Sequence, residues 1–335
     1  MSPDDAPLLQ VDAVTRHFDI RSSRTGQAGT LRAVDGVSFP VNAGETLGIV
    51  GESGCGKSTL ARVVVGLLAP SAGTIQVRGV DLWERGAPGL QRRRSVQMVF
   101  QNPSGSMNPR LEVGASVSEP LRARGVRRTA DRVAHMLALV GLQPDMARRL
   151  PHELSGGQQQ RASIARALIA EPLLVVHDEA VASLDISLQA QILNLLLELQ
   201  DRLGTAYIFI SHDLAAVQAI SHRVAVMYLG EIVEAAPAVA FVHRPLHPYA
   251  VALRRAALLP DPVLERSRPD IVLTGDVPSP LSPPSGCRFR TRCPIAVARC
   301  AEERPVLRDV GHEHRVACHF PGAYDGRQDT RHGRC

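Results

Sequence analysis

A glycine-rich segment, residues 51–58 with the sequence GESGCGKS, constrains this chain more than any other feature. It fits the pattern G-x-x-x-x-G-K-S/T of a phosphate-binding loop, directly after an apolar run (47–50) and directly before a helical stretch. Glycines let successive backbone N–H groups converge on phosphate oxygens without Cβ clashes, and the N-terminus of the following helix adds partial positive charge. We therefore predict a nucleotide phosphate site here.

The loop motif gives roles to individual residues. Lys57 is expected to reach the β- and γ-phosphates of a nucleotide, and the hydroxyl of Ser58 is expected to ligate Mg²⁺. Cys55 occupies a variable position of the motif, and we interpret it as a small filler, not as a nucleophile. The loop residues predicted to contact the nucleotide are Gly51, Ser53, Gly54, Cys55, Gly56, Lys57, Ser58 and Thr59.

Strand-like and helix-like segments alternate along the chain, which predicts an α/β fold. Apolar residues alternate over 37–41, and helical periodicity is clearest over 188–203, where Asp185 and Ser187 are available as caps. Such alternation is typical of a mostly parallel sheet covered by helices on both faces. Apolar runs predict further strands at 47–50, 74–77, 96–100, 173–176, 207–210 and 224–228.

The pattern changes along the chain suggest three parts. We assign residues 8–240 to a nucleotide-binding domain, within which residues from about 102 to 170 form an inserted helical subdomain. Proline and glycine then interrupt regular patterning, so residues 241–325 are expected to be an appended region made mostly of loops, with a helix around 249–259, followed by a tail at 326–335. The chain has no internal repeat, which predicts one nucleotide site and not a tandem pair.

Composition excludes several classes of protein. The 335 residues are 44% hydrophobic, enough to bury a core, while only 4% are aromatic, which argues against a stacking platform for single-stranded nucleic acid. The net charge of +5 is spread along the chain, so we interpret it as a solvated arginine-rich surface and predict no nucleic-acid partner. Asp4 and Asp5 stand where a signal peptide needs positive charge, and no apolar run approaches the ~20 residues of a membrane span. Export is not expected, and any work at a membrane needs other chains.

A second pair of motifs separates the classes that share a phosphate loop, since the loop alone would suit a kinase, a GTPase or a motor ATPase. Residues 154–161, with the sequence LSGGQQQR, precede a helix, and the apolar run at 173–176 leads into His177-Asp178-Glu179. In these motifs the chain resembles ABC transporter ATPases, whose signature is Leu-Ser-Gly-Gly-Gln and whose Walker B strand ends in paired acids. The resemblance implies the ABC-ATPase fold of that family, ATP hydrolysis, and ATP and Mg²⁺ as cofactors.

The resemblance implies a role for each matching residue. Asp178 would hold Mg²⁺. Glu179 would polarise the attacking water, because neighbouring side chains on a strand point to opposite faces and Glu179 therefore points away from Asp178. Gln101 would sense the γ-phosphate and the water beside Mg²⁺, and His212 would contact the γ-phosphate as a switch. Phe18 stands where the family places an adenine-stacking aromatic, with a core aromatic on a strand as the alternative.

The signature implies a dimer. If it opens a helix of the inserted subdomain, it cannot reach its own phosphate loop, and in the family it completes the site of a second ATPase subunit across a head-to-tail interface. The residues expected to act in this way are Ser155, Gly157, Gln158 and Asp185.

The chain departs from the family pattern at four positions near the paired acids. Ala180 follows the catalytic glutamate where proline is usual, His177 replaces a small apolar residue, and Ala182-Ser183 replaces Ser-Ala before Leu184-Asp185. These changes touch neither acid, so hydrolysis is still expected. The detailed contacts across the dimer interface do not follow from the resemblance at these positions.

Further motifs narrow the resemblance to the ATPases of oligopeptide, dipeptide and nickel importers. They are QNP at 101–103, MNPR at 107–110, HPY at 247–249, PSP at 278–280 and PPSGC at 283–287. The chain looks like the second of two different ATPase subunits, which implies a heterodimer and two transmembrane permease subunits. An extracytoplasmic binding protein would take part indirectly, and the chain would lie peripherally at the cytoplasmic face of the membrane. An exporter motor, a non-transport ABC ATPase and a metal-responsive regulatory module are the alternatives.

Four cysteines crowd the appended region: Cys287, Cys293, Cys300 and Cys318. Four thiolates could hold Zn²⁺ or a 4Fe–4S cluster, but separations of five, six and seventeen residues match neither zinc ribbons nor ferredoxins. The importer ATPases share a cysteine-rich tail that looks like an iron–sulfur site, so the resemblance favours a structural cluster. Zinc, and free or disulfide-forming cysteines, are the alternatives. The nearby histidines that could substitute as zinc ligands are His312, His314 and His319.

Overall fold

The computed structural model describes residues 6–21, 28–182, 184–256 and 275–326. Several sequence predictions lie outside the described residues: those that concern Asp4 and Asp5, Ser183, the end of the helix expected around 249–259, and residues 327–335 of the tail. Within the described ranges, no helix is long and apolar enough to cross a membrane.

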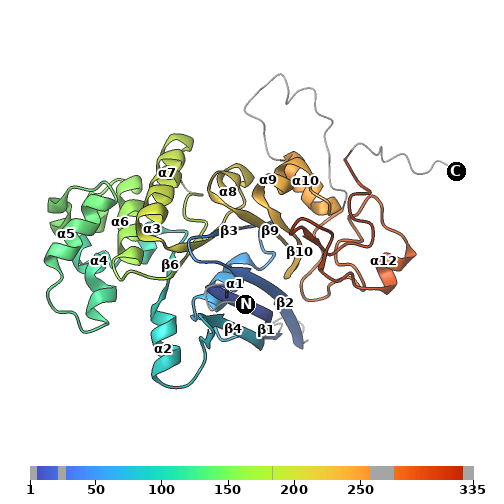
Figure 1. The fold of residues 1–335 in the computed structure, drawn as a ribbon, viewed down its shortest axis with the longest axis horizontal. Helices are drawn as coiled ribbons and strands as arrows, with labels where there is room; N and C mark the ends of the chain where they lie inside the picture. The colour runs from blue at the N-terminus through green and yellow to red at the C-terminus, as the bar shows by residue number, and fades with distance from the viewer. Residues whose placement is uncertain (1–5, 22–27, 183, 257–274, 327–335) are drawn as a thin grey trace.

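The main sheet, among the described residues, has eight strands in the order β11-β12-β10-β9-β3-β8-β7-β6, and the strands from β9 to the edge strand β6 are parallel. The antiparallel strands β10, β12 and β11 continue it at one edge, and Figure 1 shows β10 beside β9 on that side. The predicted α/β fold with a mostly parallel sheet is therefore confirmed. The strands are β3 (Thr46–Val50), β6 (Val96–Val99), β7 (Leu174–Asp178), β8 (Ala206–Ile210), β9 (Arg223–Tyr228), β10 (Glu231–Pro237), β11 (Arg308–Asp309) and β12 (Arg315–Val316).

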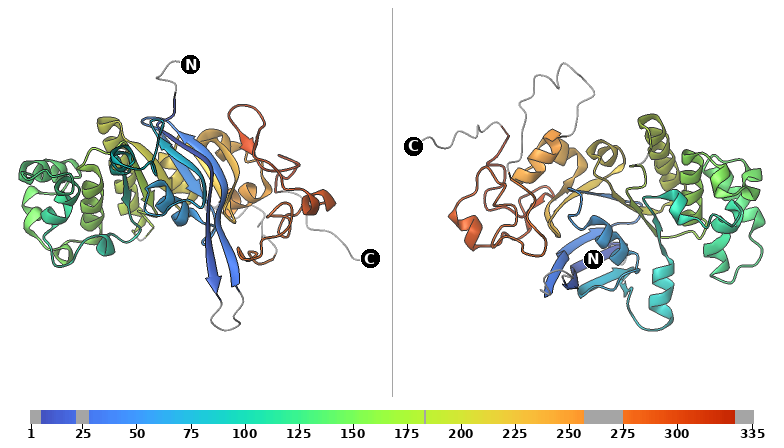
Figure 2. Two further views of the ribbon diagram at one scale, coloured as in Figure 1. Left: turned by 90° about the horizontal axis from the view of Figure 1, so that it is seen from below. Right: turned by 180° about the vertical axis from the view of Figure 1, so that it is seen from behind.

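A second, antiparallel sheet in the order β2-β1-β4-β5 packs against the first. Its strands are β1 (Leu9–Arg21), β2 (Ala28–Val41), β4 (Ala72–Val77) and β5 (Val80–Asp81). The hairpin of β1 and β2 projects from the body of the molecule (Figure 2, left). Apolar residues of both sheets and of α1 (Lys57–Val64) form one core cluster, with Val11, Ile49 and Leu60 among its fully buried members.

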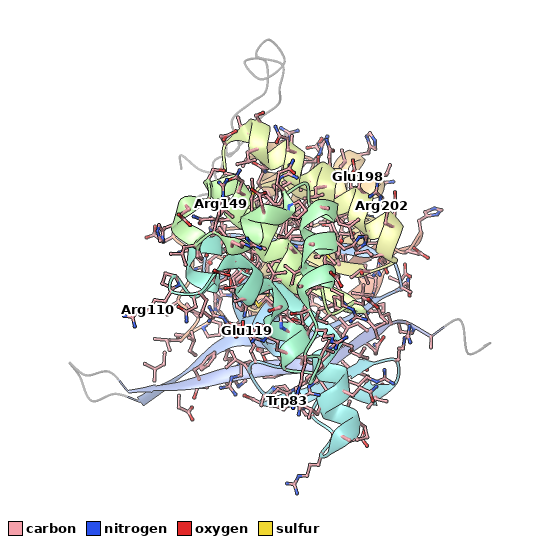
Figure 3. All side chains as sticks on the ribbon, turned by 90° about the vertical axis from the view of Figure 1, so that its left-hand side faces the viewer. Trp83, Arg110, Glu119, Arg149, Glu198 and Arg202 are labelled. Atoms are coloured by element: carbon pink, nitrogen blue, oxygen red, sulfur yellow. The ribbon has the colours of Figure 1, made fainter. Side chains whose placement is uncertain are left out.

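Helices cover the main sheet, and three of them gather at one end of the molecule (Figures 1 and 3). These are α4 (Val113–Arg122), α5 (Ala130–Leu139) and α6 (Gly156–Leu168), and they pack on one another in the part expected to be a helical subdomain. The remaining α-helices are α2 (Ala87–Arg94), α3 (Pro103–Ser106), α7 (Ile186–Leu203), α8 (Leu214–Ile220), α9 (Ala238–His243), α10 (Pro248–Ala256) and α12 (Ala298–Glu302), and the 3₁₀ turns are η2 (Pro144–Arg148) and η3 (Pro151–Glu153).

Two polar side chains fix where the helices that carry motifs begin. Ser155 accepts a hydrogen bond from the Gln158 N–H at the start of α6, and the Gln158 side chain accepts one from the Ser155 N–H. Asp185 accepts from the Leu188 N–H (2.9 Å) at the start of α7, which confirms the predicted cap. Each carboxylate or hydroxyl satisfies a first-turn N–H that has no partner within its helix.

The appended region contains more regular structure than predicted. Besides α10, which agrees with the helical stretch predicted around 249–259, it contributes α12 and the short strands β11 and β12, and these strands extend the main sheet. Glu234 of β10 ties this region down, because its fully buried carboxylate accepts hydrogen bonds from the N–H groups of Leu246 and His247 and lies 2.7 Å from Nε2 of His314. These long-range contacts, not local periodicity, order the region.

We predict that Glu234→Ala destabilises the chain, because it leaves two buried N–H groups and the His314 ring without their acceptor. The expected loss is about 2–4 kcal/mol in the free energy of unfolding, measured by urea denaturation. Glu198→Ala, at an exposed position of α7, is the control and should change the free energy by less than about 0.5 kcal/mol. Equal stability of the two variants would contradict the anchoring role of Glu234.

Candidate active site

The phosphate-loop motif lies between β3 and α1, as predicted, and the backbone there requires glycine. A Cβ on Gly56 (φ 109°) would lie 2.0 Å from the Ala33 carbonyl oxygen, and one on Gly51 would lie 2.2 Å from that of Met227. The loop borders a pocket of about 340 Å³. Its lining residues are Leu31, Arg32, Ala33, Ser53, Gly54, Cys55, Gly56, Lys57, Ser58, Thr59, Gln101, Glu179, Leu229, Gly230 and Pro280.

Lys57 lies at the base of this pocket with its ammonium group almost fully buried. Its Nζ donates to the carbonyl oxygens of Gly51 (2.7 Å) and Glu52 (2.9 Å), so the charge is held against its own loop. An ammonium group in this position can exchange those carbonyls for phosphate oxygens without leaving the pocket.

Ser58 and Asp178 form a candidate magnesium site. The Ser58 hydroxyl donates to Oδ1 of Asp178 (3.0 Å), which brings the first turn of α1 to the carboxyl end of β7. Burial raises the pKa of Asp178, and the hydrogen bond from Ser58 opposes that rise. A hydroxyl and a carboxylate oxygen within hydrogen-bond distance of each other are ligands that suit Mg²⁺, so the residues fit the ion that the sequence predicts.

Glu179 lies between Gln101 and His212, which follow the ends of two other strands of the main sheet and contact its carboxylate. Gln101 follows β6 and donates from Nε2 to Oε2 of Glu179 (2.7 Å), while His212 follows β8 with Nδ1 at 3.5 Å from Oε1. Glu179 has φ 50°, a left-handed conformation that costs a non-glycine residue about 1–3 kcal/mol. Its N–H donates to the Ile210 carbonyl (2.9 Å), and this bond to the neighbouring strand helps to hold the turn.

The signature residues lie apart from this pocket. Ser155 and Gly156 are exposed at the start of α6, and a Cβ on Gly157 would lie 2.7 Å from Leu188 of α7. None of Ser155, Gly157, Gln158 and Asp185 lines the pocket beside the phosphate loop. Their predicted contact with the site of a second subunit stays a prediction.

Phe18 is also absent from the pocket lining. It lies on β1 opposite Leu31 of β2, which does line the pocket, and the Arg16 guanidinium lies 4.7 Å from its ring centroid. Its predicted stacking on adenine therefore stays a prediction, supported only by its place beside Leu31.

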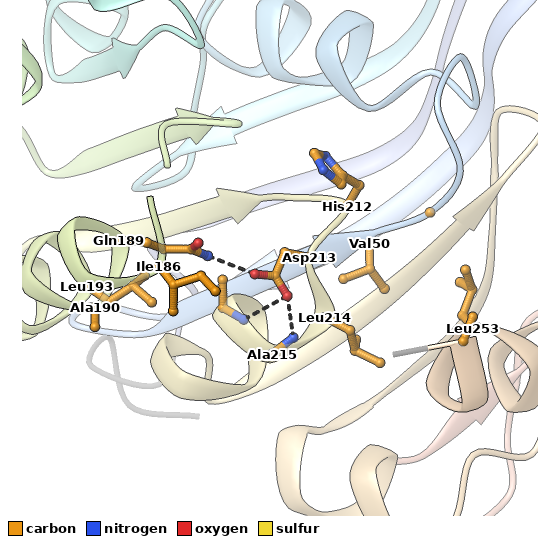
Figure 4. Close-up of a pocket in the computed structure, with 13 residues that line it drawn as sticks. Val50, Ile186, Gln189, Ala190, Leu193, His212, Asp213, Leu214, Ala215 and Leu253 are labelled. Carbon is orange, nitrogen blue, oxygen red and sulfur yellow. Dashed lines mark hydrogen bonds between the residues drawn. The ribbon is translucent and has the colours of Figure 1, made fainter. Parts of the chain in front are cut away.

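A larger pocket of about 580 Å³ lies on the other side of Gly51 and His212 (Figure 4). Most of its lining is apolar, and its carboxylate, Asp213, is engaged by Nε2 of Gln189 (2.7 Å) and by the Ala215 N–H (2.9 Å). It lacks a hydroxyl–carboxylate pair and a lysine, so the smaller pocket is the candidate active site.

Several residues that line this pocket were not predicted from the sequence. Leu31, Arg32 and Ala33 come from β2, Leu229 and Gly230 from the turn after β9, and Pro280 from the appended region. These residues carry no motif of their own. The one signal available was Gly230, a glycine shortly after the strand-like run predicted at 224–228.

The four cysteines of the appended region are free thiols, without disulfides. Burial raises the pKa of Cys287 to about 11 and of Cys293 to about 12. Among the described residues, no group of three or more His, Cys, Asp or Glu side chains is arranged to hold a metal ion. Of the histidines considered as zinc ligands, His314 pairs with Glu234 and His319 lies 3.0 Å from the Glu303 carbonyl. The predicted cluster or zinc site therefore gains no support.

The loop, the magnesium-type pair and the glutamate between Gln101 and His212 define a phosphate-loop ATPase site. Family models match the chain as an ABC transporter over residues 34–182 and as an oligopeptide/dipeptide transporter C-terminal region over 233–300. The chain belongs to the ABC transporter ATP-binding proteins and carries the C-terminal region of the oligopeptide/dipeptide group, which confirms the resemblance.

Two curated relatives are similar over nearly the whole chain. One is named Probable peptide ABC transporter ATP-binding protein y4tS, from Sinorhizobium fredii; it is 50% identical, covering 93% of this chain and 89% of the relative. The other is the oligopeptide transport ATP-binding protein OppF of Salmonella typhimurium, which is 49% identical, covering 93% of this chain and 95% of the relative.

Two solved structures share the fold. Clostridium perfringens cbiO1, part of the ABC transporter complex cbiONQ, is 28% identical with a TM-score of 0.59, covering 70% of this chain and 90% of that one. A dimeric, post-hydrolysis structure of the ATP-binding cassette MJ0796 bound to ADP and Pi is 26% identical with a TM-score of 0.60, covering 69% of this chain and 98% of that one.

We predict that Lys57→Ala weakens ATP binding itself, because it removes the positive charge at the base of the pocket. The dissociation constant should rise at least about tenfold, measured by equilibrium titration of the full-length chain. His212→Ala is expected to bind ATP and to hydrolyse it slowly, because its ring contacts Glu179 and not the loop. Arg122→Ala, at an exposed position of α4, is the control. Equal affinity of the wild type and the Lys57 variant would overturn this role.

Proposed function

We propose that this chain is the ATP-hydrolysing subunit of an ABC importer that takes up di- or oligopeptides through separate membrane subunits. The observation that carries the proposal is the position of Glu179, held between Gln101 and His212 at the edge of the phosphate-loop pocket. The names of the curated relatives and the matched C-terminal region support peptides as the transported class.

The proposed mechanism assigns one task to each group. Loop N–H groups and Lys57 neutralise the phosphate oxygens, and Ser58 and Asp178 would hold Mg²⁺, which would supply charge stabilisation at the phosphates. Glu179 accepts the proton of the attacking water, while Gln101 fixes its carboxylate from one side. The ring of His212 lies on the other side of that carboxylate, where it can follow the γ-phosphate.

The proposal includes a head-to-tail dimer with a second, different ATPase subunit. The exposed Ser155 and Gly156 at the start of α6 support it, because an exposed helix N-terminus can receive a phosphate from another chain. The solved relative that is dimeric supports pairing of such subunits in general. Two permease subunits would complete the complex, with an extracytoplasmic binding protein acting indirectly, and the chain would lie at the cytoplasmic face.

The division into residues 8–240, 241–325 and 326–335 is part of this proposal, with the second part specific to peptide importers. The match of the C-terminal family model to residues 233–300 supports it. The iron–sulfur cluster, or zinc, at Cys287, Cys293, Cys300 and Cys318 rests on the resemblance alone, and no step of the proposal depends on it.

Glu179→Gln tests the hydrolytic role. The amide keeps the shape of the side chain but cannot accept the proton, so we expect turnover to fall about 10²- to 10⁴-fold while ATP still binds. The measurement is phosphate release at saturating ATP together with an equilibrium titration of the same variant. Normal turnover in this variant would remove Glu179 from the mechanism.

Isolation of the chain from native membranes tests the transport assignment. We expect two permease subunits and a second ATPase subunit to co-purify with it. An exporter would instead be recovered with membrane subunits that move substrate outward, and a non-transport ATPase with ribosomes or DNA. Either of these results would replace the importer assignment.

A further inference from the structure

The appended region holds the phosphate loop directly through Glu52, the second residue of the loop. Both carboxylate oxygens of Glu52 accept from Arg292, at 2.8 and 3.1 Å, in a bidentate pair. The Glu52 N–H donates to the hydroxyl of Tyr249 in α10 (2.8 Å). Its carbonyl oxygen accepts from Nζ of Lys57 (2.9 Å). Every polar group of Glu52 is therefore engaged, two of them by residues about 200 or more positions away in sequence.

Arg292 is held rigidly where it makes this contact. Its side chain is 8% exposed, and its guanidinium lies 6.0 Å from the ring centroid of Tyr228. Tyr228, Tyr249 and Phe289 pack on one another, with ring centroids between 4.7 and 5.5 Å apart, and all three are fully buried. A planar guanidinium held in a part-buried bidentate pair restricts its carboxylate partner more than a fully exposed pair does.

A second arginine of the appended region, Arg288, contacts another residue that lines the pocket. We call residues 287–293 the clamp segment; it begins and ends with cysteine and turns through Arg290 N–H to Cys287 O (3.1 Å) and Arg292 N–H to Phe289 O (3.0 Å). Buried Arg288 donates to the carbonyl oxygen of Leu229, which lines the pocket, and pairs with Asp35 and Glu231. The clamp segment thus contacts both the phosphate loop and Leu229, whose neighbour Gly230 donates its N–H to the Cys55 carbonyl oxygen of that loop (2.8 Å).

We propose that the clamp segment is a built-in part of the nucleotide site, and that Arg292 is a positioning residue which acts through Glu52 to hold the phosphate loop ready for ATP. This inference rests on the proposed function. A glycine-rich loop loses much backbone freedom when it orders around phosphates, and a loop that is already held loses less on binding. The clamp should therefore govern ATP affinity more than the chemical step, because Gln101, Glu179 and His212 lie outside it.

The test compares Arg292→Gln, Arg292→Lys and Tyr249→Phe with the wild type, in the full-length chain for binding and in the complex isolated from membranes for turnover. We expect the dissociation constant for ATP and KM to rise about tenfold for Arg292→Gln, with kcat within about twofold of the wild type. Arg292→Lys should recover part of the loss, and Tyr249→Phe should weaken binding by releasing the Glu52 N–H. Arg299→Ala, an exposed arginine of the same region, is the matched control.

A double-mutant cycle separates positioning from a general loss of structure. If Arg292 acts through Glu52, Arg292→Gln should change ATP affinity little in a Glu52→Gln background. Equal additional loss in that background, or wild-type affinity in a folded Arg292→Gln chain, would overturn the inference. Absence of ATP binding and turnover in the wild type would overturn the proposed function instead, so the two failures are distinguishable.

Discussion

The parallel pairing of β6, β7, β8 and β3 is the constraint on which the rest of the site depends. Parallel strands end at a common edge, so the residues that follow these four strands meet at the same place: Gln101 two positions after β6, Glu179 directly after β7, His212 two positions after β8, and the phosphate loop after β3. The register brings Asp178 opposite Ile210, and the Glu179 N–H then reaches the Ile210 carbonyl. A slip of one residue would turn both acids to the wrong faces.

The parts of the fold and site that could be predicted are those that depend on local sequence. The phosphate loop, the paired acids and the cap at Asp185 each depend on a few consecutive residues, and their positions follow from backbone conformation. The strands β11 and β12 could not be predicted, because two-residue strands show no periodicity; β12 forms against β10, and β11 forms against β12. The partners of Glu52 were beyond prediction for the same reason, since Arg292 lies 240 positions away.

Two of the departures from the family pattern near the acids, His177 and Ala180, are buried in the core, whereas Ala182 is exposed. His177 is fully buried on the opposite face of β7 from Asp178, where its ring lies edge-on to Tyr207 at 4.8 Å between centroids. Burial lowers the pKa of His177 to about 3, so the imidazole is neutral and packs as an aromatic side chain. Ala180 is likewise buried in the main core cluster. A histidine beside the magnesium-type carboxylate therefore adds no charge to the site.

The long-range contacts of the appended region also affect how the chain can be divided into domains. A boundary at residue 240 follows the sequence pattern, yet Tyr249 and Phe289 belong to the core cluster that also contains Val175 and Phe209 of the main sheet. Burial in a shared core makes the two parts fold together, since neither can expose its side of that core to water without cost. The appended region is thus fastened in two ways, by Glu234 at the sheet edge and by the clamp segment at the pocket. In the clamp segment, Arg288 contacts Leu229, which lines the pocket, and Arg292 contacts Glu52 of the phosphate loop. These two arginines therefore link the stability of the appended region to the order of the phosphate loop.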